Sequence, residues 1–93
     1  MVRVAKIRFV EIYAGNDDVY VVYNTKKPFK EGHAHIRNFN TANYLAKLVA
    51  YNQYPKSCKS AYLLESLIRL ETDRKKIQKL HQMSATLKKK RRN

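Results

Sequence analysis

Alternating apolar and polar positions dominate the first forty residues. In residues 3–13, RVAKIRFVEIY, one face of an extended strand would carry Ala5, Ile7 and Phe9, and the other Lys6 and Arg8. A turn cluster, GNDD at 15–18, separates this segment from VYVVYN at 19–24, which is rich in β-branched and aromatic residues. The pattern predicts two strands joined as a β-hairpin.

A third strand is predicted after a break in the pattern. Pro28 and Gly32 interrupt residues 25–32, because proline lacks a backbone donor and glycine loosens the chain. HAHIRNF at 33–39 then alternates again, with Ala34 and Ile36 facing one way and a polar set facing the other: His33, His35 and Arg37. Short connections between the three strands predict an antiparallel meander.

The spacing of apolar residues changes to a helical period from residue 40. Leu45, Leu48 and Val49 predict a first helix, capped by Asn40 or Thr41 and ended before Pro55. A second helix is predicted from Ala61 to about Met83, capped by Ser57 or Ser60, with an apolar stripe of Leu63, Leu64, Leu67, Leu70, Ile77 and Leu80. We expect the part beyond about Asp73 to project from the body of the protein.

These elements define an α+β fold with the order β-β-β-α-α, in which a small three-stranded antiparallel sheet precedes two helices. Ninety-three residues suffice for one small domain, which we assign to residues 1–83. Serine and threonine at 84–86 are poorer helix formers than the residues before them. Residues 84–93 are therefore predicted to be a basic C-terminal tail.

The charge of the chain is large and unevenly distributed. The formal net charge is +13, and self-repulsion of that size favours an anionic partner. Residues 1–46 carry a net charge of +3, whereas residues 47–93 carry +10, and Asp73 is the last acidic residue. This asymmetry predicts an anion-binding C-terminal end.

Two groups of basic residues are candidates for contacts with nucleic acid. The first would bind phosphates and consists of Arg74, Lys75, Lys76, Lys79, Lys88, Lys89, Lys90, Arg91 and Arg92. The second would lie on the polar face of the sheet and reach a groove: Lys6, Arg8 and Arg37. The alternative for the first group is a solubilising tail, and for the second an ordinary solvent face.

Other chemistry has weaker support in the sequence. Tyr20, Tyr44, Tyr51 and Tyr54 could stack on bases of a single strand, although such tyrosines more often lie at the boundary of a core. His33 and His35 would share a strand face, yet two imidazoles without further ligands do not predict a metal site. The chain holds no phosphate-binding loop and no catalytic motif, so we expect neither an enzyme nor a cofactor.

Together these features predict a small non-enzymatic nucleic-acid-binding protein, an accessory or regulatory factor of phage or mobile-element type. DNA is favoured, and RNA stays open because no base-reading motif decides between them. The alternative is a protein that inhibits or modulates an enzyme through its basic surface. The lone Cys58 and the absence of long apolar runs predict a cytoplasmic protein without a membrane partner. The oligomeric state is left open.

Overall fold

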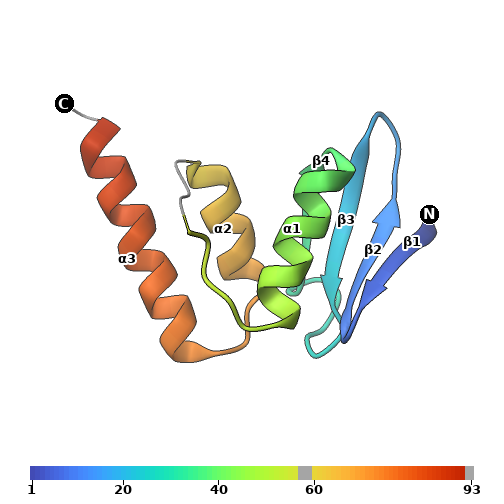
Figure 1. Cartoon of the computed structure of the whole chain (residues 1–93), viewed down its shortest axis with the longest axis horizontal. Helices are drawn as coiled ribbons and strands as arrows, with labels where there is room; N and C mark the ends of the chain where they lie inside the picture. The colour runs from blue at the N-terminus through green and yellow to red at the C-terminus, as the bar shows by residue number, and fades with distance from the viewer. Residues whose placement is uncertain (57–59, 92–93) are drawn as a thin grey trace.

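The computed structural model describes residues 1–56 and 60–91. Within these ranges the chain forms a four-stranded antiparallel sheet of order β1-β2-β3-β4 and three helices (Figure 1). The α+β class and the meander topology are therefore confirmed, with one more strand and one more helix than predicted. The elements are β1 (Val2–Ile7), β2 (Val10–Ala14), β3 (Val19–Asn24), β4 (His33–Arg37), α1 (Phe39–Ala50), α2 (Ala61–Leu70) and α3 (Arg74–Arg91).

The predicted first strand is in fact a hairpin of β1 and β2. Ile7 pairs with Val10, so only Arg8 and Phe9 make the turn, and Arg8 has a positive φ of 55°. The prediction failed because neither turn residue is a glycine, asparagine or proline, the residues that usually mark such turns. The hairpin predicted around Gly15 is the next one, β2–β3, closed by a 2.8 Å hydrogen bond from Gly15 N to Val19 O.

One face of the sheet packs against α1 and α2 and forms the hydrophobic core. Its apolar residues alternate along the strands, as a period of two requires, and include Val10, Ile12, Val22, Ala34 and Ile36. Leu45, Leu64 and Leu67 of the helices are fully buried against the same core. α1 begins two or three residues earlier than predicted from a cap at Asn40 or Thr41, because the side chain of Asn38 caps it by accepting a hydrogen bond from Thr41 N.

The predicted long helix is two helices, α2 and α3, separated by residues 71–73. Ser60 caps α2, as one of the two predicted alternatives. Glu71 is extended, with φ −79° and ψ 152°, and ends α2, while Asp73 Oδ1 accepts hydrogen bonds from the backbone of Lys75 and Lys76 at the start of α3. Instead of projecting away, α3 turns back and runs antiparallel alongside α2 (Figure 1).

The predicted tail is helical as far as the structure describes it. α3 continues without a break through residues 84–86 to Arg91. Ser84 is buried, and the Thr86 hydroxyl donates a 3.0 Å hydrogen bond to Gln82 O. These two weak helix formers are therefore accommodated by packing on α2 and by a local hydrogen bond. Arg92 lies outside the described residues.

The free edge of β4 is covered by side chains from α2. Arg69 Nε donates to His33 O at 2.7 Å, Arg69 Nη2 donates to Lys30 O at 2.9 Å, and the Tyr62 hydroxyl donates to His35 O. An uncovered edge would be a template for pairing with another chain. These contacts therefore protect the sheet on the side where α2 lies.

Candidate nucleic-acid interface

The solvent side of α3 carries most of the basic residues predicted to bind phosphates. A helical period turns Leu80, Met83, Ser84 and Leu87 towards α2 and the core. Five cations are exposed on the remaining surface of the helix: Arg74, Lys75, Lys79, Lys88 and Lys89. Lys90 and Arg91 complete the same helix. The structure thus brings these predicted residues together on one element.

Most of these cations form no hydrogen bond or ion pair through their side chains within the described part of the chain. Lys88 lies 3.4 Å from Glu65, and both side chains of this pair are more than half exposed, so the pair adds little stability. Arg74, Lys75, Lys79 and Lys89 form no side-chain hydrogen bond or ion pair with any described residue. Their charges are therefore available to an anionic ligand.

The N-terminus of α3 is unusually basic for a helix. Its first turn contains no acidic residue but begins with Arg74, Lys75 and Lys76. The helix macrodipole places partial positive charge at this end, so cations there cost stability. Asp73 at the cap offsets part of this cost through its two backbone hydrogen bonds. Helix stability therefore does not explain the two exposed cations, Arg74 and Lys75.

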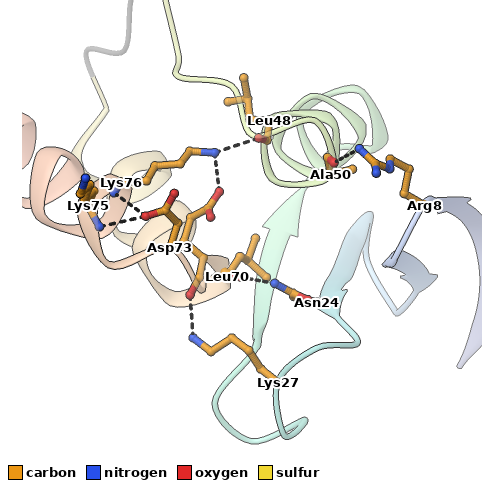
Figure 2. A network of polar contacts seen from close by, with 10 residues as sticks. Arg8, Asn24, Lys27, Leu48, Ala50, Leu70, Asp73, Lys75 and Lys76 are labelled. Atoms are coloured by element: carbon orange, nitrogen blue, oxygen red, sulfur yellow. Dashed lines mark hydrogen bonds and ion pairs between the residues drawn. The ribbon is translucent and has the colours of Figure 1, made fainter.

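Lys76 is a correction to the predicted surface. Its side chain is 1% exposed, and its Nζ lies 2.5 Å from Glu71 Oε1 and 2.9 Å from Leu48 O near the end of α1 (Figure 2). Nζ also lies 5.7 Å from the centre of the Tyr54 ring. This ammonium group is used to hold α3 against α1, so it cannot contact a phosphate while the chain keeps this fold.

Arg8 is a second correction, because it does not lie on the helix-free face of the sheet with Arg37. The turn directs its guanidinium towards α1, where Nη1 donates a 3.1 Å hydrogen bond to Ala50 O (Figure 2). Its Cζ lies 5.7 Å from the centre of the Tyr51 ring. Cations at a helix C-terminus are favoured by the macrodipole and by the unpaired carbonyls there. Arg8 thus has a structural role at the end of α1.

The backbone carbonyls at the C-terminus of α2 likewise accept hydrogen bonds from side chains. Lys27 Nζ donates to Arg69 O at 2.8 Å. It also donates to Glu71 O at 3.1 Å, and the buried amide of Asn24 donates to Leu70 O at 2.7 Å (Figure 2). Part of the positive charge of the chain therefore neutralises its own helix ends.

The helix-free face of the sheet lies at the other end of the molecule from α3 (Figure 1). Lys6 and Arg37 are exposed there, Lys6 opposite Glu11 and Arg37 opposite Val19. Glu11 accepts hydrogen bonds from the Tyr13 hydroxyl and from Arg3, both at 2.9 Å, and these two groups hold the pKa of its carboxyl below the usual value. The long axis of the protein is 42 Å, so the two predicted groups of cations form separate surfaces.

The histidines of β4 take part in aromatic packing. The ring of His33 stacks on Phe29 with centroids 4.4 Å apart, and His35 meets it edge-on at 5.2 Å. His33 Nδ1 lies 2.5 Å from Phe29 O. In the described ranges, no three side chains among His, Cys, Asp and Glu gather as a metal site would require. Cys58 lies outside those ranges.

The tyrosines named as candidate stacking residues divide into two kinds. Tyr20 packs edge-on against Phe39, with ring centroids 5.5 Å apart, and belongs to the boundary of the core. Tyr44, Tyr51 and Tyr54 are each about half exposed, on α1 and on the segment that follows it. Tyr44 and Tyr54 line a surface hollow together with Leu48, Gln53 and Lys56.

Comparison of the chain with protein-family models, with curated proteins and with solved structures finds no match in any of the three. In the part of the chain that the structure describes, none of the helices combines the length and apolar character needed to cross a membrane. The functional argument therefore depends on the surfaces described above.

Proposed function

We propose that this chain is a small non-enzymatic nucleic-acid-binding protein whose α3 contacts the sugar-phosphate backbone. The observation that carries the proposal is the set of four exposed cations on α3 that have no partner among the described residues: Arg74, Lys75, Lys79 and Lys89. An 18-residue helix is roughly 27 Å long, which is enough to follow several successive phosphates.

The difference between basic residues that are bonded within the fold and basic residues that are exposed on α3 supports this proposal better than the net charge does. Arg8, Lys27, Arg69 and Lys76 are bonded to backbone carbonyls, so their presence is explained by the fold. The exposed cations of α3 have no such explanation, and those in its first turn oppose the macrodipole. A polyanion would compensate their mutual repulsion and release the counterions condensed on its own phosphates.

The salt dependence of binding provides a quantitative test. If the four cations each neutralise one phosphate, log K falls against log[salt] with a slope of about −3 to −4. Binding is measured by fluorescence anisotropy with labelled DNA and RNA of mixed sequence, in a salt series that starts at about 50 mM. A slope close to zero contradicts phosphate binding by α3.

A matched pair of variants locates the interface. The α3 variant changes Arg74, Lys75 and Lys79 to Gln, and the control changes Lys6, Lys30 and Arg37 to Gln; each removes one arginine and two lysines. We expect the α3 variant to weaken binding to all sequences and to reduce the slope by about 2 to 3, whereas the control keeps both close to wild type. Equal losses in the two variants would show that binding follows net charge alone.

The alternative function, modulation of an enzyme through the basic surface, makes a different prediction in the same assay. Absence of binding to DNA and RNA at about 50 mM salt would remove the nucleic-acid proposal. Tight binding to a protein with an acidic patch would then be required, with an association rate that falls as salt is added.

A further inference from the structure

A hollow of about 570 Å³ lies beside the C-terminal half of α1. Tyr44 and Tyr54 line it with their aromatic rings, Leu48 supplies an apolar wall, and Gln53 and Lys56 supply polar groups. Both tyrosines are more than 40% exposed, whereas Leu48 is buried. The hollow thus offers aromatic surfaces that the fold itself does not cover.

The end of α1 builds this hollow. Tyr51 N donates to Lys47 O, and Asn52 takes a positive φ of 52°, which allows Gln53 N to donate back to Leu48 O at 2.8 Å. This is the Schellman type of helix end, in which a residue of left-handed conformation reverses the chain. The reversal returns Tyr54 to the side of α1 that carries Tyr44, across Leu48.

The same carbonyl ties the hollow to α3. Leu48 O accepts the hydrogen bond from Lys76 Nζ as well, and Lys76 Nζ lies beneath the ring of Tyr54. Lys79 is exposed and lies three residues further along the helix, on the turn of α3 that follows the buried Lys76. No described residue of α3 lines the hollow itself, but the contacts of Lys76 place it next to the first turn of α3.

The lining favours a flat, polar-edged aromatic ligand that carries negative charge. Two aromatic rings provide stacking surfaces, and the side-chain amide of Gln53, which has no hydrogen-bond partner among the described residues, can pair with the edge of a base. Lys47 and Lys56 are exposed on the same segments, and the described residues that line the hollow include no acidic one. A purely apolar ligand would leave these polar groups without partners.

We propose that this hollow binds an unpaired base of a single-stranded nucleic acid whose phosphates lie along α3. The inference rests on the proposed function and adds the class of ligand: a strand with unpaired bases, in preference to a regular duplex. In a duplex the bases are stacked and paired, so an accessible base face is offered only by a single strand, a loop or a bulge.

The experiment compares two single strands of equal length and charge, a 12-nucleotide oligothymidine and its fully abasic counterpart. Stacking on aromatic side chains predicts that the wild-type chain binds the base-containing strand roughly 10-fold or more tightly. Changing Tyr44 and Tyr54 to Ala should bring that ratio close to one while leaving the affinity for the abasic strand unchanged. Changing both to Phe keeps the rings and should keep the ratio.

The outcomes separate this inference from the proposed function. Equal, salt-dependent binding of both strands by the wild-type chain overturns the base site and leaves phosphate binding by α3 intact. A preference for bases that survives the Tyr44→Ala and Tyr54→Ala changes places base recognition elsewhere and also overturns the proposal for this hollow. Binding of neither strand overturns both proposals. The wild-type comparison needs no variant, so it holds even if the alanine variants fold poorly.

Discussion

Replacing Lys76 by methionine tests the distinction between a cation that stabilises the fold and the exposed cations of α3 that we propose to bind phosphates. Methionine keeps an unbranched, flexible side chain but removes the ammonium group that lies 2.5 Å from Glu71 Oε1 and 2.9 Å from Leu48 O. Glu71 is only 4% exposed, so its carboxylate loses its partner in the protein interior. The change therefore leaves a buried charge unpaired.

The expected loss is large for a domain of this size. Breaking a buried ion pair by removing one partner costs about 3–5 kcal/mol, against a total stability of roughly 5–15 kcal/mol for a typical domain. With a urea m-value of about 1–2 kcal/mol/M, the midpoint of unfolding should fall by roughly 1.5–5 M. Adding Glu71→Gln should recover much of the loss, because no unpaired charge then remains inside.

Urea denaturation followed by circular dichroism measures these midpoints, with Lys79→Met as the matched control. Lys79 is exposed, so its replacement should change the free energy of unfolding by no more than about 0.5 kcal/mol. Under conditions where both variants are folded, Lys79→Met should weaken binding to nucleic acid, and Lys76→Met should not. If the two variants unfold at the same urea concentration, the burial of Lys76 that we describe is refuted.

Three further predictions concern polar contacts elsewhere in the fold. Asn24→Ala removes the cap from Leu70 O and should lower the free energy of unfolding by about 2 kcal/mol in the same denaturation assay; a neutral effect contradicts the cap. The pKa of Glu11 in the folded state lies below its ordinary value of 4.5, so its carboxylate stabilises the fold above that pH, and this contribution is lost as the pH falls through the lower value. Glu11→Gln should therefore reduce the change of the melting temperature between about pH 5 and pH 3. A pH profile identical to that of the wild type opposes this assignment. Arg69→Met uncovers the edge of β4 and should increase self-association in sedimentation velocity relative to wild type; equal sedimentation would show that the edge needs no cover.

The strand and helix periods of the apolar residues predicted the class of fold. The prediction failed at two element boundaries, the β1–β2 turn and the break between α2 and α3. The β1–β2 turn escaped notice, yet a signal was present: inward apolar positions change phase from Ala5 and Ile7 to Val10 and Ile12. An odd-to-even change of this kind indicates a turn or bulge between two strands. The break at residues 71–73 had one local signal, since Asp73 can cap a helix, but the end of α2 also depends on distant side chains such as Asn24.

The sequence predicted which basic residues belong to the candidate site, but not which of them are exposed and which are bonded within the fold. Counting charges found the basic end of the chain, and the structure places its described members on α3. The sequence could not separate Lys76 from Lys75 by charge, but helical spacing could have done so, since Lys76 precedes Leu80 by four residues on the inward stripe. The role of Arg8 depends on the β1–β2 turn, which the sequence-based prediction missed.

The unequal anchoring of α3 has a consequence for how the protein moves. Its first turns are fixed by the Asp73 cap, the buried Lys76 and Leu80, whereas Met83 and Leu87 further along are only partly buried. Opening of the helix should therefore begin at its distal end, and amide protons there should exchange with deuterium sooner than those near Leu80. A nucleic-acid strand bound along α3, as we propose, would then contact a rigid N-terminal part and a more mobile C-terminal part of the helix.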